Sequence, residues 1–152
     1  MESVSATEDA EPTIQTVTFS LVASAHLALA ELERREKLST LVTQNIDGLH
    51  QKAGNSREVV IEIHGTVREV VCMSCDERAP MQRALDRVRA GEADPPCRSC
   101  GGILKSATIS FGQNLVPEDL DRARRAAEAC DVFLALGTSL TVYPVAYLPH
   151  IA

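Results

Sequence analysis

Four cysteines of this 152-residue chain form two C-x-x-C pairs, Cys72 with Cys75 and Cys97 with Cys100, separated by 21 residues. Pairs at this spacing are typical of a site where four thiolates bind one zinc ion tetrahedrally, at Zn–S distances near ~2.3 Å. Four ordinary buried thiols are the alternative interpretation. Because four thiolates leave no open coordination position, such a zinc ion would be structural, and catalytic groups must lie elsewhere.

A second candidate site is the polar cluster "TQNIDGLH", residues 43–50, which follows the apolar pair Leu41 and Val42. In open α/β sheets, ligands bind where buried strands end. The cluster therefore predicts a ligand pocket, and a capping loop without a ligand is the alternative.

His64 ends the β-branched run "VVIEIHG", and "GTSL", residues 137–140, follows another apolar run. A neutral imidazole at a strand end can serve as a general base near neutral pH, although a structural histidine fits the pattern equally well. The amides and hydroxyls of "GTSL" could hold a phosphate or a ribose.

Helices and strands alternate around these motifs. The pattern predicts an amphipathic helix over 22–37, strands in "LSTLVTQN", "VVIEIHG" and "SATISFG", a short helix in "PMQRALDRVRAG", a helix in "VPEDLDRARRAAEAC" and a buried strand in "DVFLALGTS". This alternation indicates an α/β fold with a largely parallel sheet. The cysteine-containing segment interrupts it as an inserted lobe.

Composition narrows the function classes. The formal charge of -6 and the pI near 5.2 argue against direct nucleic-acid binding, which needs a basic surface. No stretch has the ~20 apolar residues of a membrane span, and the acidic start lacks the pattern of a signal peptide. We therefore expect a folded protein of the cytoplasm with no membrane partner.

In their order and spacing, "TQNIDGLH", "IHGT", the two cysteine pairs, "SFG" and "GTSLTVYP" resemble the sirtuins, the NAD-dependent protein deacylases, from about Val22 onward. The resemblance implies a partial Rossmann-like NAD-binding domain over 21–71 and 103–152, a zinc-binding lobe over 72–102, and a disordered leader over 1–20 outside the family. It also implies NAD as co-substrate and an acyl-lysine protein or peptide as substrate. The acyl group would pass from lysine to ADP-ribose as nicotinamide is released.

The resemblance assigns a role to each motif. His64 would be the general base, with Asn45 and Asp47 as further catalytic residues. The expected NAD contacts are Gln44, Asn45, Ile46 and Asp47 at nicotinamide and its ribose, and Gly137, Thr138 and Ser139 near the phosphates and ribose. The expected substrate contacts are Phe111, Gly112, Val142 and Tyr143.

The sequence also departs from the sirtuin pattern. No two glycines are spaced G-x-G, so the glycine-rich phosphate loop of the family is absent, and only 42 residues precede "TQNIDGLH". The chain ends soon after "GTSL", before the later strands of the family. We therefore expect the central part of a sirtuin with weak NAD binding and little or no deacylase activity alone. The alternative is a catalytically inactive zinc-containing module that binds peptides.

Overall fold

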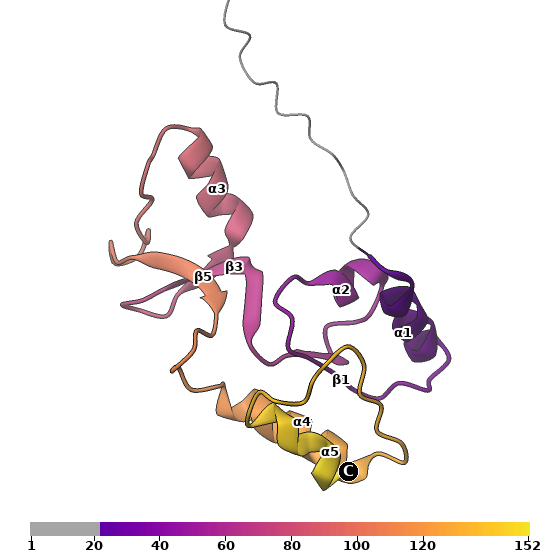
Figure 1. The fold of residues 1–152 in the computed structure, drawn as a ribbon. Coiled ribbons are helices and arrows are strands. Elements are labelled where there is room, and N and C mark those ends of the chain that lie inside the picture. Colours follow the sequence, from indigo (N-terminus) through magenta and orange to yellow (C-terminus); the bar gives the residue numbers. More distant parts are fainter. Residues whose placement is uncertain (1–21) are drawn as a thin grey trace, which may run out of the picture.

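The computed structural model describes residues 22–152, and the expected leader over 1–20 lies outside the described residues. Figure 1 shows two parts joined by the long strand β3 (Gly65–Cys72) and by the chain that runs from β5 (Leu104–Thr108) to α4 (Pro117–Ala129). An α/β part carries both described ends, and a smaller lobe carries α3 (Met81–Arg89). The inserted lobe that the cysteine spacing predicted is therefore present.

The first half of the α/β part follows the predicted alternation of helix and strand. Its elements are α1 (Ser24–Arg34), β1 (Leu41–Thr43), α2 (Leu49–Ala53) and β2 (Val60–Glu62). β1 and β2 pair in parallel, with Leu41 opposite Val60 and Thr43 opposite Glu62. The parallel arrangement is confirmed, although this sheet has two strands among the described residues.

The core of the α/β part lies where β2 meets the later helices. These helices are α4 (Pro117–Ala129), the 3₁₀ helix η1 (Val145–Tyr147) and α5 (Leu148–Ile151). The buried cluster consists of Ile61, Ile63, Ala123, Ala127, Val145 and Leu148. Pro117 starts α4 and acidic residues follow in its first turn, as the free amides and positive dipole of a helix start favour. β2 is therefore anchored in the core, and His64 lies just beyond its end.

The lobe is a three-stranded antiparallel sheet in the order β4-β3-β5, with α3 packed beside β3. Its strands are β3 (Gly65–Cys72), β4 (Arg78–Pro80) and β5 (Leu104–Thr108). The sheet extends beyond the expected bounds 72–102 at both ends, because the strand before the first cysteine pairs with the strand after the last. The lobe is thereby anchored directly beside His64.

Gly65, the residue after His64, makes this junction possible. Its φ is 76°, and a Cβ there would lie 2.2 Å from the carbonyl oxygen of Ala107 on β5. Only glycine adopts this backbone conformation without strain and lets the two strands come this close. In the "HG" pair, His64 thus supplies the imidazole and Gly65 supplies the backbone turn by which the chain enters the lobe.

The buried strand expected in "DVFLALGTS" is wrong. Residues 131–140 are all exposed and form no strand; Val132 is 82% exposed and Leu134 is 64% exposed. A strand needs a neighbour for its backbone hydrogen bonds, and neither β1 nor β2 pairs with this segment. Its apolar composition predicted burial, but local composition says nothing about whether a pairing partner is at hand.

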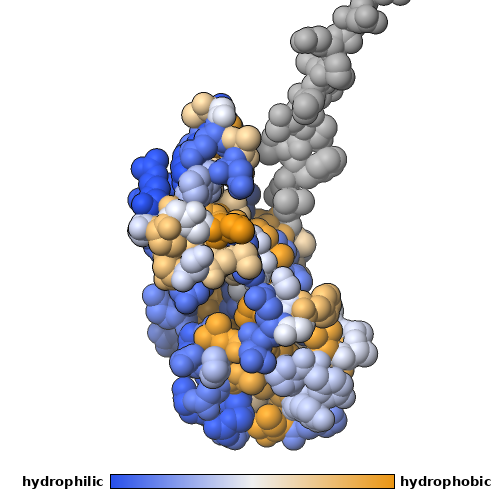
Figure 2. Space-filling view, turned by 90° about the vertical axis from the view of Figure 1, so that its left-hand side faces the viewer, coloured by the Kyte–Doolittle hydropathy of each residue, from blue (hydrophilic) through white to orange (hydrophobic). Residues whose placement is uncertain are grey.

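The described surface has apolar and hydrophilic regions side by side. Figure 2 shows the lobe as largely hydrophilic at its top and apolar patches lower on the molecule, between hydrophilic regions. Within residues 22–152, no helix has the length and apolar character that a membrane crossing requires.

The Glu33 carboxylate ties α1 to the turn before β2. It accepts hydrogen bonds from the Asn55 side chain at 2.8 Å and from the Ser56 amide at 3.1 Å. Bonds from Ser56 and Asn55 lower the pKa of Glu33 below its ordinary value of 4.5. We expect Glu33→Ala to reduce the free energy of unfolding by about 1 kcal/mol, a value that allows for screening by solvent.

The same contact predicts a pH dependence. A depressed carboxyl pKa contributes stability above the unfolded-state value, and this contribution disappears as the pH falls through the lower pKa of the folded state. In urea unfolding, the difference between wild type and Glu33→Ala should therefore be full near neutral pH and shrink below about pH 4.5. A difference that grows on acidification would contradict the assignment, and Glu36→Ala, without these contacts, is the control.

Candidate active site and metal centre

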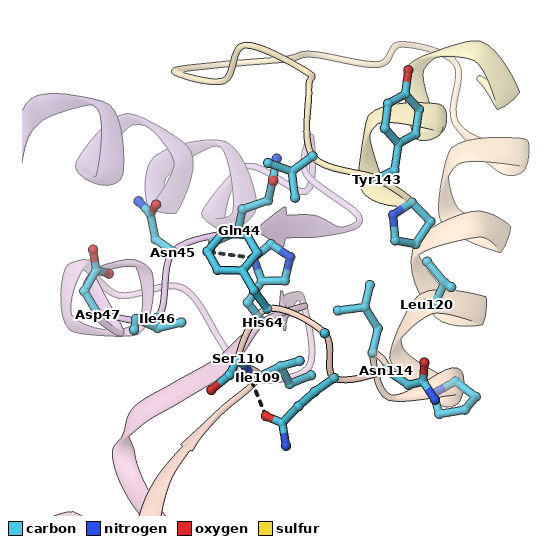
Figure 3. Close-up of a pocket in the computed structure, with 17 residues that line it drawn as sticks. Gln44, Asn45, Ile46, Asp47, His64, Ile109, Ser110, Asn114, Leu120 and Tyr143 are labelled. Carbon is cyan, nitrogen blue, oxygen red and sulfur yellow. Dashed lines mark hydrogen bonds between the residues drawn. The ribbon is translucent and has the colours of Figure 1, made fainter.

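The polar loop after β1, the end of β2, the segment after β5 and residues 142–144 surround one cleft of about 880 Å³ (Figure 3). Nine of the expected site residues line it: Gln44, Asn45, Ile46, Asp47, His64, Phe111, Gly112, Val142 and Tyr143. They come from four separate segments of the chain. The fold therefore brings together groups that the sequence only placed in order.

His64 has a defined orientation in this cleft. Its Nδ1 lies 3.1 Å from the backbone oxygen of Gln44, as the dashed line in Figure 3 marks. A carbonyl oxygen can only accept, so the hydrogen bond requires the proton on Nδ1. In the neutral ring Nε2 then carries a lone pair, which is the form that a general base needs.

The "QNID" loop is held mainly through its backbone. The amide of Val67 on β3 donates to the Ile46 oxygen at 2.9 Å, and the Asn45 amide donates to Thr43 Oγ1 at 3.1 Å. The Asp47 carboxylate accepts from the Leu49 amide at 2.9 Å, at the start of α2. In Figure 3 the Asn45 and Asp47 side chains point away from the His64 ring. They form a cleft wall separate from the imidazole.

Two of the three "GTS" residues line a different cavity from the one that holds His64. Gly137 and Thr138 line a second cavity of about 400 Å³, together with Gln44 and Asn45, which border both cavities. Gln44 Nε2 donates to Thr138 Oγ1 at 3.2 Å. Ser139 does not line either cavity, and its hydroxyl pairs with that of Thr141. Gln44 is thus the link between the two halves of the expected cofactor site.

The wall opposite the loop continues β5 and has both apolar and polar residues. The Ile109 amide donates to the His64 oxygen at 2.9 Å, so strand pairing carries on past Thr108 into the cleft. Phe111 follows with a fully exposed ring at 101% of its reference area. Sequence reasoning missed the cleft residues Ile109, Ser110, Asn114, Leu115, Pro117 and Leu120. For Ile109, Ser110 and Asn114 the available signal was their position in or next to "SFG", whereas Pro117 and Leu120 lie on α4 and had no such signal.

Gln113 shapes this wall. Its Oε1 accepts from the Ser110 amide at 2.8 Å and from Lys105 Nζ at 3.1 Å. It therefore closes the turn that presents Phe111 and Gly112 to the cleft.

The four paired cysteines converge in the lobe as the spacing predicted. Their sulfur atoms all lie within 4.8 Å of one another; Cys72 Sγ is 3.4 Å from Cys100 Sγ, and Cys75 Sγ is 3.7 Å from Cys97 Sγ. Tetrahedral zinc with four thiolates places its sulfurs about 3.8 Å apart. All four are free thiols. The cluster therefore fits a structural zinc ion.

Backbone amides donate to two of the cluster's sulfur atoms. The Ser74 amide donates to Cys72 Sγ and the Gly102 amide to Cys100 Sγ, each at 3.4 Å. The Ser74 contact lowers the pKa of the Cys72 thiol to about 7, whereas at Cys75 the effect of the Glu77 amide is outweighed by the contacts with Cys100 and Cys72, which raise the pKa of the thiol to about 12. Since metals bind the deprotonated sulfur, Cys72 is the cysteine of this pair that loses its proton more readily to the ion.

Together, a parallel β1–β2 pair, a cleft with an oriented histidine and an inserted Cys₄ lobe define a class of α/β protein whose ligand site borders a structural zinc lobe. Comparison with known proteins places the chain within this class. Residues 10–144 match the Sir2 family. The chain belongs to the Sir2 family, and the match begins within the segment 1–20 that the motifs had set apart.

Curated relatives agree with this assignment. The chain is 52% identical over 129 residues to "NAD-dependent protein deacetylase 2" of Streptomyces coelicolor, a match that covers 85% of the chain and 54% of the relative. It is 43% identical to "NAD-dependent protein deacylase" of Thermococcus kodakarensis, covering 84% of the chain and 49% of the relative. The chain thus spans about half the length of the curated relatives it matches.

Solved structures share the fold. One described as "Sir2-p53 peptide-NAD+" matches with a TM-score of 0.75 at 35% identity, covering 84% of the chain and 52% of that structure. Another, of Sir2Af2 bound to a myristoylated histone peptide, matches with a TM-score of 0.70 at 41% identity, covering 84% and 53%. The parallel sheet and the cysteine lobe are therefore features of a sirtuin fold.

Proposed function

We propose that this chain provides the acyl-lysine and nicotinamide half of an NAD-dependent protein deacylase. The observation that carries the proposal is the contact of His64 Nδ1 with the Gln44 oxygen, which leaves Nε2 in the cleft without a hydrogen-bond partner among residues 22–152. NAD supplies the ribose that accepts the acyl group. Relatives named as NAD-dependent deacetylases and deacylases support this choice of reaction.

Different residues of the cleft have different roles in the proposed reaction. His64 takes a proton from a ribose hydroxyl as the acyl group moves from lysine to the ribose. Asn45, Ile46 and Asp47 border the nicotinamide end, where an aspartate can accept from a carboxamide NH₂ and an asparagine can bond the ribose or a water. Gln44 reaches toward Thr138 and the phosphate side.

The substrate is an acylated lysine on an extended peptide. Phe111 and Gly112 line the wall that continues β5, and Val142 and Tyr143 line the cleft from the separate segment 142–144. A peptide can add as a further strand beside the β5 wall, a mode of binding that tolerates varied sequences. Structures of relatives with acetylated, propionylated and myristoylated peptides support an acyl-lysine partner. The exposed Phe111 ring is a suitable contact for the acyl chain or the lysine stem.

A release assay tests the activity. The purified chain, at high concentration, is incubated with NAD and an acetyl-lysine peptide, and nicotinamide and acetyl-ADP-ribose are measured by mass spectrometry. We expect slow, peptide-dependent release of both, because the chain lacks a G-x-G phosphate loop to bind NAD tightly. If neither product forms while the peptide still binds, the chain acts instead as a zinc-containing peptide-binding module.

The same chemistry supports the cytoplasm as the compartment. Four thiolates that bind zinc must stay reduced, which the cytosol ensures and oxidising compartments do not. Fractionation of cells that make the chain should place it with the soluble fraction, and recovery in an oxidising compartment would contradict this.

A further inference from the structure

The nicotinamide-side loop rests on a charged side chain from the zinc lobe. Arg68 lies on β3, next to Val67, whose amide donates to the Ile46 oxygen at 2.9 Å. The Arg68 side chain passes against the loop at Gly48. A Cβ on Gly48 would lie 2.5 Å from Arg68 Nε and 2.6 Å from Arg68 Cδ. This contact explains why the loop needs a glycine directly after Asp47.

The same side chain reaches the strand that carries the histidine. Arg68 Nη2 lies 3.4 Å from Glu62 Oε2, and Glu62 is the last residue of β2, two positions before His64. The pair is partly shielded, with side chains 37% and 17% exposed. One arginine therefore contacts both Gly48, which directly follows "QNID", and the end of β2.

Each member of the pair also has one buried polar atom that is not hydrogen-bonded. Arg68 Nε, a donor, and Glu62 Oε1, an acceptor, have no partner among residues 22–152. Arginine and carboxylate can pair through two parallel bonds, a geometry that lysine cannot reproduce. Closing this second bond would fix the arginine, and with it the loop that lies against it.

We propose that Arg68, held by Glu62, is a positioning residue that sets the place of the Ile46–Gly48 loop relative to His64. The proposal rests on the proposed function for its meaning, since this loop borders the nicotinamide end of the cleft. It assigns the zinc lobe a part in the site beyond stability, because β3 places the arginine against the loop. Arg68 itself lines neither cavity and acts through the loop.

The variants Arg68→Met and Arg68→Lys separate shape from charge. Methionine keeps much of the apolar stem, whereas lysine keeps the charge but loses Nε and the planar fork. The matched control is Arg78→Met, which removes another arginine of the same sheet, paired with Glu69 at 2.9 Å but outside the cleft. Glu62→Gln tests the partner.

Three measurements decide the outcome on the full chain. Nicotinamide affinity is measured by ligand-observed NMR, peptide affinity by fluorescence anisotropy and local order by hydrogen exchange of the 45–49 amides, with zinc per chain as the check on the lobe. For Arg68→Met we expect nicotinamide to bind about tenfold more weakly and 45–49 to exchange at least tenfold faster. Peptide affinity and zinc content should stay within twofold of wild type. Arg68→Lys should show most of the same loss, Glu62→Gln part of it, and Arg78→Met none.

Two results would overturn the positioning role. One is unchanged exchange at 45–49 in Arg68→Met. The other is a parallel loss of zinc, peptide binding and protection across the lobe, which would make Arg68 a support of the fold. Should wild type bind no nicotinamide, the proposed function fails at that point, and the exchange data still decide whether Arg68 orders the loop.

Discussion

Serine in place of Cys97 is expected to reduce bound zinc from one ion per chain to nearly none and to disorder the lobe around β3 and α3. Cys97 is buried, and its sulfur lies within 4.8 Å of the other three. Losing one of four thiolates removes the closed tetrahedral shell, and structural zinc contributes on the order of 10 kcal/mol to small domains of this kind. The lobe has little else to hold it, because all of α3 and β4 lie outside the buried core.

The measurement combines zinc content by mass spectrometry with hydrogen exchange of residues 65–108. Cys130→Ser is the matched control, since Cys130 is a partly buried free thiol outside the cluster that donates to the Ala127 oxygen. It should keep its zinc and its lobe. Retention of zinc by Cys97→Ser, or equal loss by Cys130→Ser, would show that the four paired cysteines do not form the zinc site.

Disorder in the lobe should also reach the cleft. β3 begins at Gly65, directly after His64, and its Val67 amide holds Ile46. β5 leads into the wall that carries Phe111. A zinc ion bound by the four cysteines would therefore lie away from the cleft but support two of the segments that surround the cleft. A chelator applied to wild type should weaken peptide binding even though no zinc ligand lines the cleft.

Much of the site was predictable because its residues sit at ends of elements. "QNID" follows β1 and His64 follows β2, and the ends of parallel strands meet at one edge of a sheet. "SFG" follows β5 of the other sheet, which the hydrogen bond from the Ile109 amide to the His64 oxygen brings to the same place. The cysteine pairs were predictable because metal geometry fixes their spacing. These signals are local in sequence, so no knowledge of tertiary packing was needed to find them.

Other features depended on partners that local sequence does not specify. "DVFLALGTS" has the composition of a buried strand, yet it stays exposed because neither described parallel strand pairs with it. The lobe begins at Gly65 rather than at the first cysteine because β3 and β5 pair across a long insertion. Arg68, within "TVREVV", reads as an ordinary solvent-facing residue of a strand. Only its contacts with Gly48 and Glu62 reveal a role.

Removing the imidazole of His64 should lower the rate of acyl transfer by about a hundredfold or more, the usual contribution of a positioned general base. His64→Asn is the sharper variant, because its amide NH₂ can still donate toward the Gln44 oxygen while offering no base. Peptide affinity should stay near that of wild type in both His64→Ala and His64→Asn. His150→Ala, an exposed histidine on α5, is the control and should leave the rate unchanged.

Measuring the two products separately distinguishes a loss of the general base from a loss of NAD binding. In the proposed reaction, acetyl-ADP-ribose forms only after the proton is taken from the ribose hydroxyl, whereas nicotinamide leaves before that step. Under single-turnover conditions with the chain in excess, His64→Asn should therefore lose acetyl-ADP-ribose more than nicotinamide release. Equal losses would indicate that the histidine shapes the NAD site, and an undiminished rate would show that the proton leaves by another route. The assignment of His64 as general base thus rests on the Nε2 lone pair, which both variants remove.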